Sequence, residues 1–522
     1  MEVRRYQRKW SIYEDQSEVS FGVNAEFINH AWMKASAKLR PTILRLWDQL
    51  FDAEYECQNI EEHYLNEIAR IERRVNELEA RFIQDPHNSN KPSSSEPFKK
   101  TQRTRSLREK TGRAPGGQPG HAGHFLAHVP NPDEKRIHPV YRCERCGHPL
   151  KALPVLQHEQ RQVIDIKNGK KWIIEHKAEM KRCPKCDSIN HGGFPNEAKA
   201  YVCYGPEVKR IALYLLSYQM IPHARICELM EHLFELSLKP GSIHRFAIEL
   251  SRALKGWENQ AKKTIIHAKS AHFDETGLRC KGGLWWLHDS STANYTLLIP
   301  HPKRGAEAMS AIGILPDFKG WAIHDGWWPY FNFQSLSQPH ALCNAHHLRE
   351  LTFVEEIEKA KWARDMKNFL QHSVRHLHRC KRKGQAIRPQ WIGSREKDYD
   401  RILRRGYRFY GKSMPRHCFA PREGPKDKRD AGHNLLRRLH YYREETLAFL
   451  KHPCVPFTNN QAERDIRMAK VKQKISGCFR SFGGAKAFCR VRSFLSTSLK
   501  QAKNPFQALQ DFYPPIPQAL TT

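Results

Sequence analysis

The chain has 522 residues, which allows roughly two to four domains, and its 39% hydrophobic content excludes a wholly disordered protein. Its 87 Lys and Arg against 55 Asp and Glu give a net charge of +32, which favours nucleic acid as partner, with an anionic membrane as the competitor. No apolar run of the roughly 18 residues that span a bilayer is present, and the first residues lack a signal peptide's apolar core. The 14 cysteines are therefore expected in a reducing compartment, as metal ligands or small buried groups.

Residues 1–42 carry no assignable pattern, whereas the segment 43–84 has the apolar spacing of a coiled coil. Twelve positions at alternating steps of four and three residues run from Ile43 to Phe82, and ten of them are apolar or cysteine. The flanking positions are rich in Glu and Arg, and no helix breaker interrupts the run. We therefore predict a leucine-zipper-like coiled coil that joins copies of the chain. One long amphipathic helix packed on its own chain is the competing interpretation.

The segment 85–125 has the composition of a linker. It begins with a Pro/Ser/Asn-rich stretch, continues with seven basic residues and one acid in Lys99–Arg113, and ends rich in Gly and Pro. One interpretation is a basic arm that follows DNA phosphates, and the other is a merely solvated linker. The first interpretation predicts DNA contacts from Lys99, Lys100, Arg103 and Arg105.

Two Cys-x-x-Cys pairs mark the segment 126–200 as a zinc-binding knuckle domain. The pairs are separated by 36 residues, within which "QRQVIDI" and "KWIIEHKAEMKRC" have the pattern of strands. Paired knuckles of this kind place four thiolates tetrahedrally around Zn²⁺. The predicted ligands are Cys143, Cys146, Cys183 and Cys186. His148 lies near the first pair, and a surface position is favoured over a ligand role for it.

The segment 201–262 has the periodicity of helices. "GPEVKRIALYLLSYQM" and "PHARICELMEHLFEL" are followed by the turn "KPGS", and we predict that Ser242 caps the next helix. Two helices joined by a short Gly-containing turn are typical of a helix-turn-helix, which the basic composition favours as a DNA-binding region. An ordinary helical pair without DNA contacts is equally compatible with the pattern.

Between 263 and 350 the pattern changes to that of an α/β layered domain. Three strands are predicted in "KSAHFDET", "GGLWWLHDSS" and "YTLLIPHP", and a helix in "RGAEAMSAIGIL". A fourth strand in "KGWAIHDGWWPY" precedes one more strand and a helix in "PHALCNAHHLREL". We expect the first and fourth strands to be neighbours at the centre of the sheet. Each carries an aspartate at or just beyond its end, Asp274 and Asp325 respectively.

Two carboxylates at adjacent strand ends can share divalent cations, which serve phosphodiester chemistry when two of them lie about 4 Å apart. Hard Mg²⁺ prefers carboxylate oxygen, and a third carboxylate on a helix would complete the set. Glu463 in "TNNQAERDIRMAK" is the candidate, with Arg467 and Lys470 on the same helical face for DNA phosphates. The competing interpretation is structural: Asn460 caps this helix, and Glu463 reaches back to the free amides or pairs with Arg467.

The sequence resembles the transposases of the insertion-sequence-66 type, members of the Asp-Asp-Glu (DDE) superfamily with a ribonuclease-H-like core. The resemblance covers about residues 43–510 and is carried by "HFDETGL", "HDGWWPY", "LCNAHHLREL", "NNQAERDIRMAKVKQKISGCFRS" and "AFCRVRSFLST", together with the linker and the two Cys pairs. Thr458 departs from the acidic residue that is usual before "NNQAER", and residues 1–42 have no counterpart.

The resemblance implies a role for each matching residue. Asp274, Asp325 and Glu463 take the catalytic and metal-ligand roles for Mg²⁺ or Mn²⁺, and Lys470 contacts substrate DNA. Cys343 and His346 match a Cys-x-x-His element, for which a structural role is expected. Asp325 and Glu463 are separated by 138 residues (463 − 325), which implies a mostly helical insertion over 351–455 in the ribonuclease-H-like core. The Glu-bearing helix and the C-terminal helices follow in 456–522.

The function implied is DNA transposition: metal-dependent phosphodiester hydrolysis at the transposon ends, then strand transfer into target DNA. The implied partners are transposon and target DNA, further copies of the chain and element-encoded accessory proteins. The implied location is the bacterial cytoplasm, at the nucleoid. Two alternatives stay open. One is a zinc-containing DNA-binding regulator without catalysis, which the intact carboxylates argue against, and the other is a metal-dependent nuclease of the same fold.

Overall fold

The computed structural model describes residues 126–333, 339–416 and 431–517, together with single positions between Leu39 and Val75. Residues 1–84 and 85–522 form two separate units, and each is considered by itself. Most of the segment 1–42 and the whole basic arm lie outside the described residues. The DNA contacts expected from the arm therefore stay predictions, namely those of Lys99, Lys100, Arg103 and Arg105.

In the first unit, the described positions from Pro41 to Val75 are helical. Their large apolar side chains are exposed, among them Leu50, Ile68 and Ile71 at positions of the predicted heptads. This is the row of side chains that a partner helix would cover in a coiled coil. The coiled coil itself stays a prediction.

The second unit begins with a five-stranded sheet. Its strands are β1 (Glu134–His138), β2 (Gln157–Lys167), β3 (Lys170–Arg182), β4 (Ile189–His191) and β5 (Val202–Tyr204). They run in the order β1-β3-β2-β5, and β4 pairs with β3. β2 and β3 form an antiparallel hairpin whose turn, Asn168 and Gly169, has positive φ at both residues, as a two-residue type I′ turn requires. The two longest strands agree with the sequence prediction.

Four helices follow: α4 (Pro206–Ser217), α5 (His223–Phe234), α6 (Pro240–Ala253) and α7 (Lys255–Ile266). The prediction that Ser242 caps a helix is wrong, because α6 begins at Pro240 and its N-cap residue is Lys239. Proline has a fixed helical φ and lacks the N–H that would find no partner in the first turn, so it is well suited to this position. These helices share an apolar core with α15 (Phe482–Lys500), in which Phe246 and Leu250 lie with Val491.

The second sheet holds β6 (Ser270–Cys280), β7 (Gly283–Ser291), β8 (Thr296–His301), β9 (Trp321–His324) and β10 (His340–Leu342) in the order β10-β9-β6-β7-β8. β6 is parallel to β9 and antiparallel to β7, so the predicted first and fourth strands are neighbours, as expected. The prediction that Asp274 lies at or just beyond the end of the first strand is wrong, because pairing with β7 continues β6 to Cys280. β9 ends at His324, immediately before Asp325.

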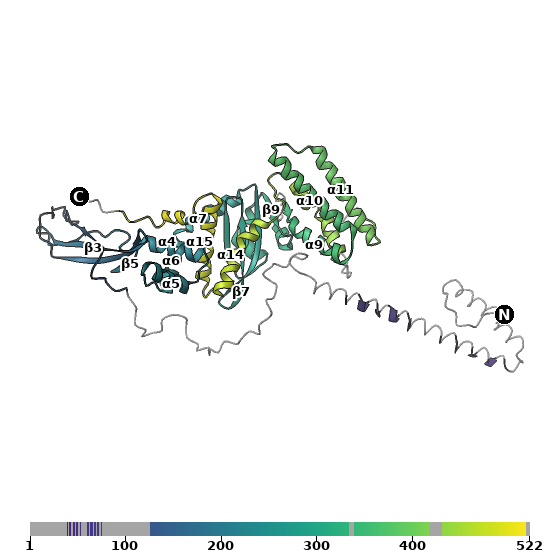
Figure 1. The fold of residues 1–522 in the computed structure, drawn as a ribbon, viewed down its shortest axis with the longest axis horizontal. Coiled ribbons are helices and arrows are strands. Elements are labelled where there is room, and N and C mark those ends of the chain that lie inside the picture. Colours follow the sequence, from purple (N-terminus) through teal and green to yellow (C-terminus); the bar gives the residue numbers. More distant parts are fainter. Residues whose placement is uncertain are drawn as a thin grey trace. The chain divides into compact units, whose positions relative to one another are not determined.

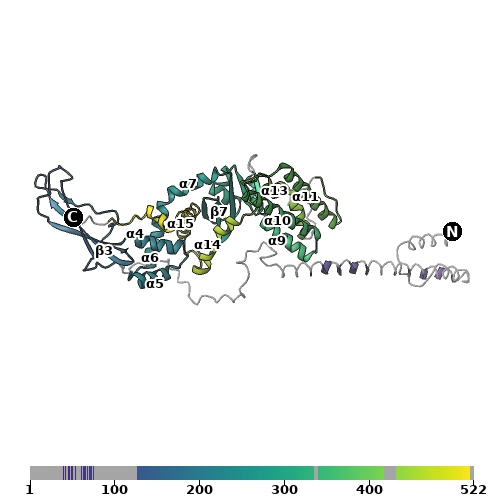
Figure 2. The same ribbon diagram turned by 45° about the horizontal axis from the view of Figure 1, so that its top comes forward.

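Helices cover both faces of this sheet (Figures 1 and 2). On one face, α14 (Asn460–Ser476) packs on the inner strands β6 and β7, and α15 packs on the edge strand β8. Leu278 and Leu287 meet Ile466 there in a common core. On the other face, α8 (Ala306–Ile312) and the 3₁₀ helix η2 (Leu315–Asp317) enclose a second core, in which Phe273 contacts the ring of Phe318 edge-on. A further 3₁₀ helix, η3 (Trp328–Phe333), follows β9.

The described residues between β10 and α14 are mostly helical, as the sequence predicts for 351–455. They form α9 (Asn344–Ile357), α10 (Lys361–Arg382), α11 (Pro389–Phe409), α12 (Ala431–Tyr441) and α13 (Arg443–Lys451). The described part of the chain ends with α16 (Pro505–Ala508) and the 3₁₀ helix η4 (Leu509–Asp511). Within the described ranges, no helix has the length and apolar character needed to cross a membrane.

Candidate active site

Asp274 lies within β6, and Asp325 directly follows β9, the neighbouring parallel strand. In the ladder between β6 and β9 the last paired residues are His272 and Ile323, and each aspartate follows the paired residue of its own strand by two positions. Side chains two residues apart lie on the same face of an extended strand. The register therefore places both residues at the same level of the sheet, two positions beyond the last paired residues of β6 and β9.

The two carboxylates differ in their surroundings. Asp325 is exposed, and its Oδ1 accepts the backbone N–H of Trp327 at 2.8 Å. Asp274 is partly buried, and its Oδ1 accepts the N–H of Glu275 at 2.8 Å. Removal from water, the carboxylate of Glu275 and that of Asp325 together raise the pKa of Asp274 well above its usual value. A cation held between these carboxylates would have the opposite effect, so the charge arrangement fits a metal site.

Glu275 is a buried anchor beside Asp274. Both Nε and Nη2 of Arg304 donate to its Oε1, at 2.9 and 2.7 Å, and the hydroxyl of Tyr330 donates to its Oε2. The Arg304 guanidinium also lies 3.9 Å from the ring centroid of Trp327. These contacts tie the strand that carries Asp274 to the segment after Asp325. Sequence reasoning assigned no role to Glu275, and no local pattern marks its partners.

Glu463 lies in the first turn of α14, near a Cys-His pair. Its Oε1 is 3.5 Å from Nη2 of Arg349 and 3.9 Å from Nε2 of His346. The ligand atoms of Cys343, His346 and Glu463 all lie within 4.8 Å of one another. Glu463 also raises the pKa of Asp274, so the two carboxylates interact electrostatically. The structure thus brings Glu463 to the region of the two aspartates, with its carboxylate nearest to the Cys-x-x-His element.

Asn459 fixes the start of α14 on the sheet. Its side-chain nitrogen donates to the carbonyl of Phe273 at 2.9 Å, and its Oδ1 lies 2.8 Å from Nδ1 of His272. Its backbone N–H points to Sγ of Cys343 at 3.0 Å. The expectation that Asn460 caps the helix is wrong, because α14 begins at Asn460 and no side-chain cap bond is made. Asn459, the residue at the N-cap position, instead uses its side chain to hold Glu463's helix against the strand of Asp274.

The two basic residues predicted on the Glu463 face have different environments. Arg467 is exposed. Lys470 is partly buried, its Nζ donates to the carbonyl of Gly277 at 2.5 Å, and burial lowers its pKa. Lys470 therefore already joins α14 to β6, and a DNA contact from it would involve the remaining donors of the ammonium group.

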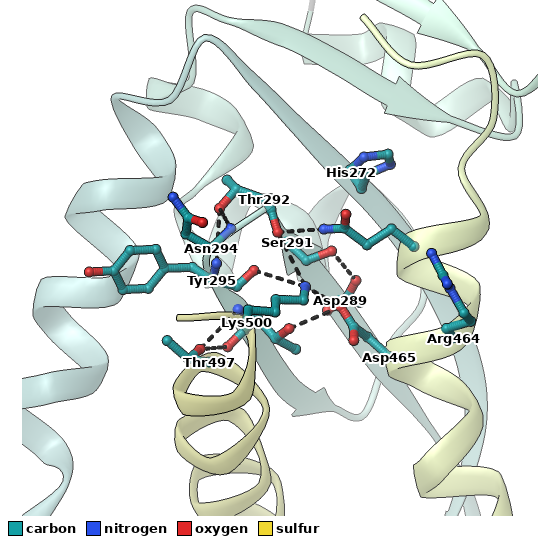
Figure 3. Close-up of polar contacts among 12 residues, drawn as sticks. His272, Asp289, Ser291, Thr292, Asn294, Tyr295, Arg464, Asp465, Thr497 and Lys500 are labelled. Atoms are coloured by element: carbon teal, nitrogen blue, oxygen red, sulfur yellow. Dashed lines mark hydrogen bonds and ion pairs between the residues drawn. The ribbon is translucent and has the colours of Figure 1, made fainter. Parts of the chain in front are cut away.

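Two further aspartates, Asp289 and Asp465, take part in a polar network on the strands and helices that carry the candidate site (Figure 3). Asp289 on β7 is the cross-strand partner of Asp274, and burial and the nearby Asp465 raise its pKa well above the usual value. Asp465 on α14 is bonded to Nζ of Lys500 at 2.6 Å and to the hydroxyl of Thr296 at 2.9 Å. This network fastens α14 to α15 and to β8, and sequence analysis did not find it because its members are far apart in the chain.

The four cysteines of the predicted knuckles lie together. Sγ of Cys143 is 3.5 Å from Sγ of Cys186, and Sγ of Cys146 is 3.5 Å from Sγ of Cys183. The two loops are alike: the N–H of Cys143 donates to the carbonyl of residue 148, and that of Cys183 to the carbonyl of residue 188. A hydrogen bond from the Ser188 hydroxyl helps to lower the pKa of Cys143, whereas burial and the neighbouring thiols raise the pKa of Cys146. Metal binding requires all four thiols to lose their protons. The donor set fits one Zn²⁺ ion.

Comparison with known protein families gives two matches. Residues 202–487 match the family described as Transposase IS66 family, a range that contains Asp274, Asp325 and Glu463. Residues 34–127, which include the predicted heptads and the basic arm, match a family of unknown function (DUF6444). No curated protein matches the chain.

Proposed function

The chain belongs to the IS66 family of transposases, and from that premise we propose that Asp274, Asp325 and Glu463 carry out metal-dependent DNA cleavage and strand transfer. The observation that carries the proposal is the register of β6 and β9, which places the two aspartates at the same level of the sheet, two positions beyond the last paired residues of the two strands. Transposition requires hydrolysis of a phosphodiester at the transposon end, followed by attack of the freed 3′-hydroxyl on target DNA. The sheet order, with helices on both faces, is compatible with a ribonuclease-H-like core into which α9 to α13 are inserted.

Asp274 and Asp325 would hold Mg²⁺ or Mn²⁺, because carboxylate oxygens suit hard divalent cations. When bound, such ions activate the attacking oxygen and stabilise the charge on the leaving one. The protein's own part is to keep the two aspartates at one level of the sheet. The bond from Trp327 orients Asp325, and the contacts of Glu275 fix the backbone next to Asp274.

Glu463 would supply the third carboxylate. Asn459 and Lys470 both bond α14 to β6, so the helix start is held on the strand that carries Asp274. In the described structure the carboxylate interacts with His346 and Arg349, and a change of side-chain rotamer would turn it toward the aspartates. Cys343 would have a structural role, which is supported by the backbone N–H that Asn459 donates to its Sγ at the helix start.

The remaining parts of the chain would serve DNA binding and assembly. We propose a structural Zn²⁺ on Cys143, Cys146, Cys183 and Cys186, because their thiols already converge. Arg467, Lys470 and the basic arm would contact DNA phosphates, and the helical segment 201–262 would bind DNA as a helix-turn-helix-like element. The predicted coiled coil of 43–84 would join copies of the chain, with accessory proteins of the element as further partners. The place of action would be the nucleoid in the bacterial cytoplasm.

The test is to incubate the purified protein with Mg²⁺ and labelled DNA that carries the element's ends. We expect 3′-hydroxyl ends at the element boundary and products joined to target DNA. Cleavage without joining would identify a nuclease of the same fold. DNA binding without any cleavage, in Mg²⁺ or Mn²⁺, would identify a DNA-binding regulator and refute the proposal.

A further inference from the structure

The C-terminal half of α10 and the segment after it form a strongly basic surface. The thirty residues from Met366 to Arg395 contain eight lysines and arginines and no aspartate or glutamate. In α10 itself, Arg375, Arg379 and Arg382 are spaced by four and three residues, which puts them on one helical face. We call the following six residues the α10 basic surface: Arg375, Arg379, Lys381, Arg382, Lys383 and Arg388.

The charges of the α10 basic surface have no acidic counterparts. All six side chains belong to exposed residues, and none of them forms an ion pair with another residue in the described ranges. Basic residues close by in the same helices behave differently. Lys367 pairs with Glu355, Arg405 pairs with Asp365 at 3.1 Å, and Arg401 pairs with Asp398 at 2.9 Å.

Stabilisation of the helix end does not account for so many cations. One or two basic side chains in the last turn satisfy the partial negative charge at the C-terminus of a helix, and that effect fades within one turn. Arg375 lies about two turns before the end of α10 at Arg382. The remaining cations repel one another at a separation of a few residues, which destabilises the helix unless an anion binds.

A groove lies beside this surface. It has a volume of about 410 Å³ and is lined by α10 and α11 through Arg375, His376, Arg379, Trp391 and Arg395, among others. The rings of His376 and Trp391 stack with centroids 4.3 Å apart and form an apolar wall. A concave strip with arginines along one side fits the ridge of a nucleic-acid backbone, because guanidinium groups bind phosphate oxygens in pairs.

We propose that the α10 basic surface binds the phosphate backbone of duplex DNA, as a contact separate from the cleavage site. The identification of the polyanion as duplex DNA rests on the proposed function, because a transposase acts on long duplex DNA. A row of cations without acidic partners is the pattern that supplies sequence-independent affinity. The surface would hold DNA flanking the cleaved bond and so add affinity without reading sequence.

The experiment measures binding of the full chain to a fluorescent duplex of unrelated sequence, without Mg²⁺, over a range of salt concentrations. The test variant is Arg379→Ala/Arg382→Ala. The matched control is Arg401→Ala/Arg405→Ala, which removes the same charge from exposed positions of α11 where each arginine is paired with an aspartate. All four positions are exposed, so both variants should keep the melting temperature of the wild type.

We expect the test variant to bind roughly tenfold or more weakly near 0.1 M salt, and its slope of log K against log salt to fall by about 2. The control should change the slope by less than about half a unit. Equal losses in the two variants would show that only net charge matters and would overturn the inference. An unchanged slope in the test variant would also overturn the inference. A parallel assay measures binding to phosphatidylserine vesicles, and a test variant that loses only vesicle binding would overturn the inference as well. A wild-type protein that binds no duplex at all would refute the proposed function itself.

Discussion

Replacing Asn459 by alanine tests how α14 is held in place. The change removes the bond to the carbonyl of Phe273 and the contact with Nδ1 of His272, at 2.9 and 2.8 Å, from a side chain that is buried. A buried polar group left without a partner costs about 1–3 kcal/mol, so two of them should lower the free energy of unfolding by about 2–6 kcal/mol. Because the N-terminus of α14 would loosen, DNA cleavage should fall more than the stability loss alone explains.

The neighbouring Asn460 provides the control. It is exposed, and we expect Asn460→Ala to change the free energy of unfolding by less than about 0.5 kcal/mol. If Asn460 were instead the helix cap, its replacement would cost about 1 kcal/mol. Thermal unfolding followed by circular dichroism should show a fall of roughly 5–20 °C for Asn459→Ala in the transition of the α/β domain. A larger shift for Asn460→Ala than for Asn459→Ala would refute this reasoning.

Three further predictions concern catalysis, zinc and assembly. Glu463→Gln should keep the DNA affinity and the melting temperature but abolish cleavage in a gel assay, because an amide cannot supply the anionic oxygen that Mg²⁺ needs. Cleavage by this variant at a rate near that of the wild type would contradict a ligand role for Glu463. Elemental analysis should find one zinc ion per chain in the wild-type protein purified without chelator and none in Cys183→Ser. Equal zinc contents in the two proteins would contradict zinc binding by the four cysteines. A peptide of residues 43–82 should sediment as an associated helix, and a monomer at high concentration would contradict the coiled coil.

The sequence was most informative where local pattern determines structure. Alternating apolar residues predicted the strands that carry Asp274 and Asp325, and their pairing followed from the α/β order. The Cys-x-x-Cys spacing predicted that four thiols converge, because two residues between cysteines suffice to turn both sulfurs to one side of a loop. Element ends were less certain: β6 continues past Glu275 because β7 is long enough to pair with its second half.

Contacts between distant parts of the chain could not be read from the sequence. Asn459 and His272 are 187 residues apart, and nothing in "NNQAER" indicates which of the two asparagines faces the sheet. The choice depends on how α14 is rotated on the sheet, which is set by the packing of Ile466 against Leu278 and Leu287. The competing interpretation of the short local pattern had named Asn460 as the cap. The bond between Asp465 and Lys500 is equally hidden, because an exposed ion pair and a buried one look the same in sequence.

The most direct test of the account is metal rescue of Asp325→Cys. Asp325 is exposed, so the replacement should not disturb the fold, and a thiolate binds Mg²⁺ poorly but accepts softer ions such as Mn²⁺. The variant should fail to cleave transposon-end DNA in Mg²⁺ and recover a measurable part of its activity in Mn²⁺, while the wild-type protein cleaves in both. Wild-type rates for the variant in Mg²⁺, or no recovery in Mn²⁺ by a variant that still folds and binds DNA, would contradict a metal-ligand role for Asp325.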